Sequence, residues 1–235
     1  MKQKKKKQKK EQASSNGTAT HDTTTTRLLS LNKKLARKLP DLMQSIERIR
    51  KTDIYLVHGC LSPEESRQCI RAAESCGFSP QSSRGAAYGE AFRDHYRLTQ
   101  HNPEVCTQVW ERTGLREVFE QHIHQDEMGT LVGLNPNLRM YDAGHRFGKH
   151  IVEACEVPGM GRTEYTLLIY LSDPVGGETV FYDDRGRVIA SVQPKAGMAL
   201  MHRHGDDWCL EHEAKPVGHG REPKYVLRSD VVYRK

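Results

Sequence analysis

Hydrophobic and polar residues follow different periodicities in the two halves of the chain. Up to about residue 128, apolar positions recur at three- and four-residue spacing, which is typical of amphipathic helices. After Gly129, short segments rich in β-branched and aromatic residues alternate with turn signals, which is typical of a sandwich or barrel. The pattern therefore predicts a helical or mixed support region, 27–128, followed by a strand-rich core, 129–235.

Helical spacing is found in several stretches of the N-terminal region. Apolar residues follow it over 27–51, where Pro40 divides the stretch into two helices, and again over 105–124. Such an apolar stripe usually packs against a core. For 27–51, a membrane-surface or partner-binding role is the alternative.

The clearest helix start follows a short strand predicted at 53–58. Ser62 can cap the helix, Pro63 suits its first position, and Glu65 completes a capping box. Gly77 supplies the stop signal. We expect this helix to cover one face of a sheet.

The stretch 79–103 is rich in Ser, Gly, Arg and Asn. A loop of this length is often a lid or a substrate edge, and an irregular connection with a short strand near 96–99 is an equal alternative. Further strands are predicted at 131–134, 138–141, 165–171, 178–182, 188–192, 199–202 and 224–233.

Charge changes the picture only at the N-terminus. The formal net charge is +6, but lysines crowd the first ten residues, so the rest of the chain is close to neutral. Residues 1–26 have too little apolar surface to offset the entropy of ordering, which predicts a disordered tail. The tail suits a nuclear address or a weak contact with nucleic acid or an acidic partner, and a solvated tail without a specific partner is the alternative.

The cysteines and the hydropathy favour an intracellular protein. Six scattered cysteines form no C-x-x-C pair, in a chain too large to need disulfide staples, which favours a reducing compartment. No stretch approaches the roughly 20 apolar residues that span a bilayer. We expect a cytoplasmic or nuclear location.

Histidines in the strand-rich half are candidate metal ligands, because neutral imidazole is a common ligand of divalent cations. They are His150, His202 or His204, and His212. A lone histidine is more often a surface or core residue. The motifs around these histidines raise the expectation that they bind a metal.

Three ordered motifs carry a family resemblance. The first contains Tyr141, Gly144, Phe147 and His150; the second runs from Tyr165 to Leu171 and continues with Gly176 to Phe181; the third contains His212, Pro216, Val217, Gly220 and Lys224. Together they resemble the iron(II)- and 2-oxoglutarate-dependent dioxygenases, and within them the prolyl 4-hydroxylase-like group. The resemblance covers roughly 53–235.

The resemblance implies both a fold and a reaction. The fold is mainly β with supporting helices: a double-stranded β-helix, or cupin-like jelly-roll, buttressed by helices of the N-terminal half. The reaction hydroxylates a C–H bond of a protein or small-molecule substrate with Fe(II), O₂ and 2-oxoglutarate, which is decarboxylated to succinate. L-ascorbate would keep the iron reduced.

The resemblance also assigns roles to residues. His150 and His212 would bind iron and be catalytic, Tyr141 would assist the keto acid, and Lys224 would hold the distal carboxylate of 2-oxoglutarate. Lys224 and Arg228 lie four apart on a predicted strand and face the same side, so either cation can reach the carboxylate. We favour Lys224, and a structural pair with Asp230 is the alternative role for Arg228.

Val152 departs from the family pattern. The resemblance requires the aspartate of a His-x-Asp ligand pair at this position, and valine cannot coordinate a cation. Strand alternation places residues 150 and 152 on one side and Glu153 on the other, so Glu153 is not an easy substitute. Three interpretations follow. The chain is a weakly metallated or inactive family member, its metal site is completed by Glu153 or a water molecule, or the chain is a point variant of an active parent. We expect poor turnover.

Two further alternatives remain open. His202 and His204 alternate on a strand near His212, a pattern that also suits a zinc or cupin-like site. A histidine-rich strand leading to the distal ligand is the favoured interpretation. The competing class of protein is a non-catalytic binding module that keeps the fold and uses the basic tail to reach its partner.

Overall fold

The computed structural model describes residues 45–49, 51–83, 91–124, 128–143, 147–205, 207–218 and 223–235. The tail predicted at 1–26 and most of the helical stretch predicted at 27–51 lie outside these ranges. Among the described helices, none is long and apolar enough to cross a membrane.

The first described strand corrects one sequence-based prediction. Ile46–Arg48 forms strand β1, which pairs antiparallel with β2, Ile54–Val57, so the helix predicted here is wrong. Ile46 and Ile49 have helical spacing, but so short a segment takes its structure from the neighbour that completes its backbone hydrogen bonds. β1 thereby becomes an edge strand of a sheet.

The remaining strands agree well with the pattern read from the sequence. They are β3 (Ser79–Ser82), β4 (Asp94–His101), β5 (Thr130–Leu134), β6 (Asn137–Ala143), β7 (Phe147–His150), β8 (Glu156–Val157), β9 (Gly161–Tyr170), β10 (Thr179–Tyr182), β11 (Val188–Val192), β12 (Ala199–Arg203), β13 (His212–Ala214) and β14 (Lys224–Arg234). The short strand expected near 96–99 is confirmed as part of β4. β3, β7, β8 and β13 are short strands that had not been predicted as separate elements.

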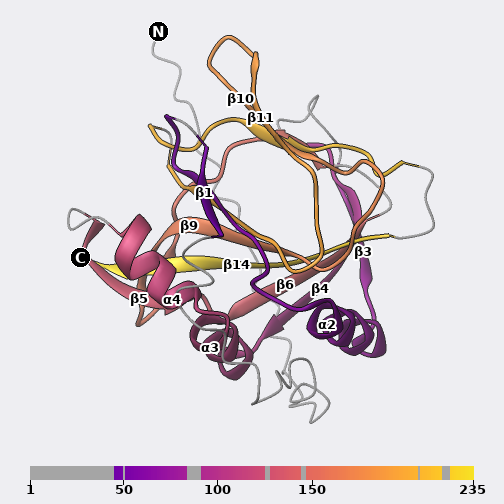
Figure 1. Ribbon diagram of the computed structural model, residues 1–235, viewed down its shortest axis with the longest axis horizontal. Coiled ribbons are helices and arrows are strands. Elements are labelled where there is room, and N and C mark those ends of the chain that lie inside the picture. Colours follow the sequence, from indigo (N-terminus) through magenta and orange to yellow (C-terminus); the bar gives the residue numbers. More distant parts are fainter. Residues whose placement is uncertain are drawn as a thin grey trace, which may run out of the picture.

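Two antiparallel sheets face each other and form the ring seen end-on in Figure 1. The larger sheet has the order β1-β2-β12-β9-β14-β6-β4-β3, with β5 beside β14 and β8 beside β9. The smaller sheet has the order β11-β10-β13-β7. This is the mainly β jelly-roll with supporting helices that the sequence predicted.

Helices cover the larger sheet on the side away from β10 and β11 (Figure 1). They are α2 (Pro63–Cys76), α3 (Pro103–Arg112) and α4 (Leu115–Val118), which continues into a π-helical turn, Phe119–Ile123. α2 begins at the predicted capping box: the Glu65 backbone N–H donates to Ser62 Oγ over 3.2 Å, and the Ser62 N–H donates to the Glu65 carboxylate over 2.6 Å. Gly77 caps its C-terminus.

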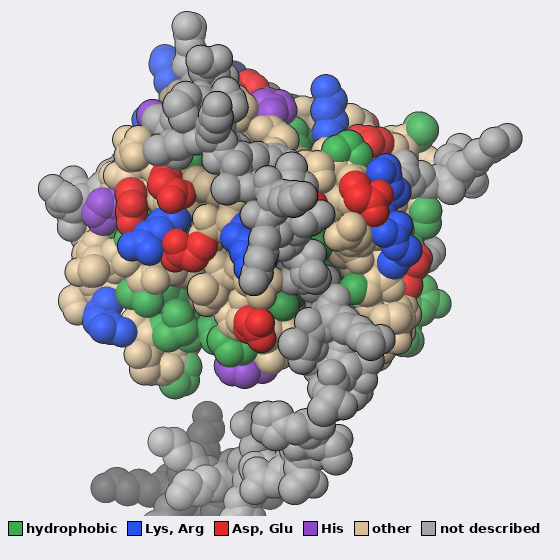
Figure 2. All heavy atoms as spheres, turned by 60° about the horizontal axis from the view of Figure 1, so that its bottom comes forward, with side chains coloured by type: hydrophobic (Ala, Val, Ile, Leu, Met, Phe, Trp, Pro, Cys, Tyr) green, Lys and Arg blue, Asp and Glu red, His purple; other side chains and the backbone are tan. Residues whose placement is uncertain are grey.

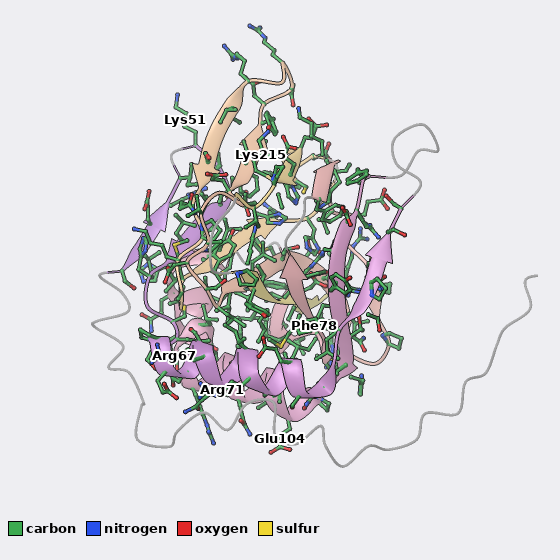
Figure 3. The ribbon with its side chains drawn as sticks, turned by 90° about the vertical axis from the view of Figure 1, so that its right-hand side faces the viewer. Lys51, Arg67, Arg71, Phe78, Glu104 and Lys215 are labelled. Atoms are coloured by element: carbon green, nitrogen blue, oxygen red, sulfur yellow. The ribbon has the colours of Figure 1, made fainter. Side chains whose placement is uncertain are left out.

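The outer face of the helices carries charges of both signs. Figure 2 shows acidic and basic side chains interspersed on this side of the molecule. In Figure 3, Arg67 and Arg71 project from α2 away from the sheets, and both form ion pairs with Glu64. Exposed pairs of this kind contribute little to stability, so apolar burial beneath the helices holds α2 in place.

Two apolar cores lie on opposite faces of the larger sheet. One packs its outer face against the helices and includes Tyr225 and Leu227. The other lies between the two sheets and includes Val226, Tyr170 and Phe181. Because alternate residues of β14 face opposite sides, the strand supplies both cores in turn. Lys224 and Arg228 therefore share the inner side with Val226.

The turn before β12 gives a stability prediction. Gly197 has φ +80°, and a Cβ built on it would lie 2.0 Å from the Leu61 carbonyl oxygen at the start of α2. We expect Gly197→Ala to lower the free energy of unfolding by roughly 2–4 kcal/mol, because it adds a backbone clash to the strain of positive φ. Gly186→Ala is the control: φ is +73° and nothing lies within 4 Å, so strain of about 1 kcal/mol is expected. Equal losses for both variants in urea unfolding would contradict the clash.

Candidate active site

The space between the two sheets holds a cavity of about 90 Å³, several times the volume that holds one water molecule. It is lined by the residues that the family resemblance assigns to iron and 2-oxoglutarate, namely Tyr141, His150, His212, Lys224 and Arg228, and by Val152. They come from β6, β7, β13, β14 and the segment after β7. Residues that lie up to 87 positions apart, such as Tyr141 and Arg228, therefore meet in one site.

His150 and His212 lie side by side on neighbouring strands of the smaller sheet. They are register partners of β7 and β13, and their ring centroids lie 4.3 Å apart. Each Nδ1–H donates to a backbone carbonyl two residues earlier, Gly148 for His150 and Leu210 for His212, both over 2.9 Å. The Nε2 atom of each ring therefore keeps its lone pair, as a metal ligand requires.

Burial keeps both rings neutral. It lowers the pKa of His150 to about 3, and repulsion from His212 adds to the shift. It also lowers the pKa of His212 to about 4, against the opposing effect of the bond to Leu210. Near neutral pH, both imidazoles are thus in the form that binds a cation.

Lys224 supplies a buried cation at another wall of the cavity. Its Nζ donates to the Gly177 carbonyl over 2.6 Å and lies 5.5 Å from the centroid of the Tyr170 ring. Burial lowers the pKa of Lys224 to about 8, against a weaker opposing effect of Glu178. The amine has no carboxylate partner within ion-pair distance among the described residues, so it suits an anionic ligand.

Arg228 is a second cation on the same side of β14. Its guanidinium forms an ion pair with Asp230 over 3.3 Å and a side-chain hydrogen bond with Tyr141. Burial alone would lower the pKa of Arg228, but Asp230 and Tyr141 hold it above its usual value. The structural pair with Asp230 is present. Even so, the buried Nε of Arg228 has no hydrogen-bond partner in the part of the chain that the structure describes.

Val152 lines the cavity beside the histidine pair, whereas Glu153 is exposed and does not line it. The backbone of residue 152 is held on both sides: its N–H donates to Cys209 Sγ over 3.2 Å, and its carbonyl accepts from the Gly205 N–H over 3.0 Å. The side chain at position 152 is therefore directed at the site, and it carries no ligand atom.

The structure gives the two alternating histidines different surroundings. His204 is hydrogen-bonded through Nε2 to Thr166 Oγ1 over 2.8 Å and through Nδ1 to Thr163 Oγ1 over 3.1 Å. His202 lines the cavity, and its ring centroid lies 4.4 Å from that of His212. His204 is thus a satisfied buried residue, while His202 belongs to the site.

Several cavity residues were assigned no role in the sequence analysis. His95 on β4 meets the Tyr141 ring edge-on at 5.0 Å, and the Tyr170 hydroxyl is hydrogen-bonded to Thr179 over 2.7 Å. β4 reaches the cavity only because it pairs with β6, a contact between strands about 40 residues apart in the chain. No local periodicity signals such a residue.

The donor set fits iron and 2-oxoglutarate only in part. The two neutral imidazoles suit Fe(II), and a cavity with two buried cations suits a dianionic keto acid. Residue 152 does not fit the carboxylate position of a two-histidine, one-carboxylate site. The arrangement can bind a small organic acid next to a cation held by two histidines.

Comparison with known proteins agrees with this arrangement. The family model of the 2OG-Fe(II) oxygenase superfamily matches residues 136–229. No protein with a curated description matches the chain. The matched range lies within the strand-rich half and includes Tyr141, His150, His212, Lys224 and Arg228.

Solved structures show the same fold. A viral collagen prolyl hydroxylase from Paramecium Bursaria Chlorella virus-1 is similar with a TM-score of 0.57 and 18% identity, over 80% of this chain and 99% of that one. A Pseudomonas putida prolyl-4-hydroxylase has a TM-score of 0.56 and 16% identity, over 84% and 100%. An oxidoreductase of the 2OG-Fe(II) oxygenase family from Burkholderia pseudomallei has a TM-score of 0.53 and 13% identity, over 83% and 91%.

At these identities the likeness to solved structures concerns the fold. Two of the three are prolyl hydroxylases, which matches the group that the motifs resembled. The family match agrees with the wider resemblance found in the sequence, to the iron(II)- and 2-oxoglutarate-dependent oxygenases. The jelly-roll fold is confirmed as well.

Proposed function

We propose that this chain uses Fe(II), O₂ and 2-oxoglutarate to hydroxylate a C–H bond of a protein or small-molecule substrate. One observation supports the proposal above others: a pair of neutral histidines and two buried cations line a single cavity. A site for a cation and a site for a dicarboxylate thereby lie side by side. One of the similar structures, the viral collagen prolyl hydroxylase, is a complex with 2OG.

The residues of the chain divide the binding between them. His150 and His212 hold the cation, while Lys224 and Arg228 attract the distal carboxylate of 2-oxoglutarate. Tyr141, bonded to Arg228, orients that end of the site. The chemistry supplied by bound iron and keto acid is insertion of an oxygen atom from O₂ into a C–H bond, with release of succinate and CO₂. L-ascorbate is the expected reductant that keeps the iron ferrous.

The stretch 79–103 supports a role in substrate recognition. His95 lines the cavity, and the guanidinium carbon of Arg93 lies 4.9 Å from the centroid of the Phe147 ring. Phe147 in turn stacks on His150 with a centroid distance of 3.8 Å. We propose that the described part of this stretch around Arg93 and His95 forms the substrate edge of the site, because Arg93 contacts the strand that carries His150.

Iron-dependent binding of 2-oxoglutarate tests the function before any substrate is known. The full chain is freed of metal, and calorimetric titration with 2-oxoglutarate is run with and without Fe(II) under anaerobic conditions. We expect binding that requires Fe(II) and weakens by roughly 100-fold or more in His150→Ala, which loses a direct ligand. His58→Ala removes an exposed histidine and should leave binding unchanged. Binding that ignores both Fe(II) and His150 would contradict the proposal.

The alternative function is a binding module that kept the fold and lost the reaction. Val152, which offers no ligand, is the observation that favours it. This alternative predicts no iron-dependent binding of 2-oxoglutarate. It predicts salt-sensitive binding of nucleic acid or an acidic partner that disappears when residues 1–26 are removed.

A further inference from the structure

A second group of metal-binding side chains overlaps the histidine pair. His202, Cys209 and His212 are all buried, and each offers one ligand atom within 4.8 Å of the others. Cys209 Sγ lies 4.0 Å from His202 Nδ1, and the His202 ring lies 4.4 Å from that of His212. His212 is thus shared between this group and the pair with His150.

Two strands and the turn between them position these side chains. His202 lies in β12 and His212 in β13, while Cys209 ends the turn that joins them. The Cys209 N–H donates to the Gly205 carbonyl over 2.7 Å, which closes the turn. Residues 202 and 212 lie on different sheets, so a cation bound to both would bridge the sheets.

The sulfur of Cys209 lies beside the backbone of residue 152, the residue at which the family pattern has lost its anion. The Val152 N–H donates to Cys209 Sγ over 3.2 Å, so the thiol is next to the residue that lacks a carboxylate. A cysteine binds a metal ion as the thiolate, and the Val152 N–H can donate a hydrogen bond to that thiolate. Thiolate and imidazole together favour a borderline-soft cation such as Zn²⁺, whereas hard cations prefer oxygen.

We propose that His202, Cys209 and His212 bind a thiophilic divalent cation, with Zn²⁺ as the expected ion. Cys209 supplies the negative charge that Val152 does not provide. The site stands independently of the oxygenase reaction, but it uses His212, which the proposed function assigns to iron. Zinc bound to this group therefore occupies His212 and leaves His150 as the remaining histidine ligand for iron. It thereby inhibits iron-dependent binding of 2-oxoglutarate.

Cobalt(II) is the probe for this site, because a thiolate ligand gives a thiolate-to-cobalt charge-transfer band in the near ultraviolet. The full chain is freed of metal and titrated with Co²⁺, and zinc affinity is measured by displacement of the cobalt. We expect the band in the parent chain, its loss in Cys209→Ser, and a roughly 10- to 100-fold weaker zinc affinity. Cys155→Ser, which removes an exposed thiol, should keep both the cobalt band and the zinc affinity of the parent chain.

Two further variants make the outcome decisive. His202→Gln should weaken zinc binding while keeping the sulfur, which guards against misfolding of Cys209→Ser. His150→Ala should keep the cobalt band and lose iron-dependent binding of 2-oxoglutarate, so failure of this inference and failure of the proposed function are separately visible. A parent chain without the band, or a band retained in Cys209→Ser, overturns the inference.

Discussion

Val152→Asp is expected to raise the affinity of the chain for Fe(II) by roughly 100-fold or more, since even residues that only support a ligand change affinity 10- to 100-fold. The side chain at position 152 lines the cavity beside His150 and His212, and its backbone is anchored at both ends. Aspartate is close to valine in volume, so it enters the same space with little repacking. It completes a two-histidine, one-carboxylate ligand set and offsets one charge of the cation.

Anaerobic iron titration and succinate release measure the effect. We expect the parent chain to turn over 2-oxoglutarate poorly and Val152→Asp to turn it over faster. Ile151→Asp is a matched control, because it adds the same charge one residue away on a side chain that is 45% exposed. Equal iron affinity and equal turnover in the parent and Val152→Asp would show that the missing carboxylate does not limit this site.

The same variant bears on Cys209. If the thiolate compensates for the missing carboxylate, Cys209→Ser should weaken metal binding more in the parent chain than in Val152→Asp. The two residues are in direct contact, so their effects are expected to be non-additive. Additive effects would indicate that Cys209 is a packing residue.

Local signals predicted the elements that are fixed by local interactions. The capping box at Ser62 and the glycine stop at Gly77 depend on neighbours within a few residues, and both are present in the structure. The alternation of β14 correctly placed Lys224 and Arg228 on one side, because strand geometry depends only on the backbone. The helix predicted around Ile46 is wrong because pairing with β2 is a tertiary interaction.

Long-range pairing explains what the sequence did not reveal. The boundary predicted at residue 128 does not separate the two regions in space: β2 and β4 precede it, yet β2 pairs with β12 and β4 pairs with β6. His95 enters the cavity through the second of these pairings. Cys209 carries no motif of its own, and its closeness to His202 and Val152 follows from the turn between β12 and β13.

Lys224→Met is expected to stabilise the fold while abolishing the binding of 2-oxoglutarate. The pKa of Lys224 is lowered from 10.5 to about 8 by burial, so the folded state holds the charged amine unfavourably. Below pH 8 the amine is protonated in both the folded and the unfolded chain, so the full free-energy cost of burying its charge is present. Stability then rises with pH, until the unfolded chain also loses the proton near 10.5. Methionine removes the penalty and loses the bond to Gly177, for a net gain of about 1–2 kcal/mol at pH 7.

The loss of binding should be large, because truncating one member of a buried charge pair typically costs 2–5 kcal/mol, or roughly 30- to 5,000-fold in affinity. Affinity of the parent chain for 2-oxoglutarate should also fall above pH 8, as free Lys224 loses its proton, by up to about tenfold per pH unit. Lys224→Met should show no such pH dependence.

Two controls separate the roles of the cations. Lys215, on the upper part of the molecule in Figure 3, pairs with Glu213 over 2.7 Å, and its side chain is 41% exposed. Lys215→Met should change stability by less than about 0.5 kcal/mol and leave 2-oxoglutarate binding intact. Arg228→Met leaves Asp230 buried without its ion-pair partner, so it should destabilise the fold where Lys224→Met stabilises it. The two cations lie on the same side of one strand, so either can reach the distal carboxylate. If Arg228→Met removes 2-oxoglutarate binding and Lys224→Met does not, Arg228 is the anchor.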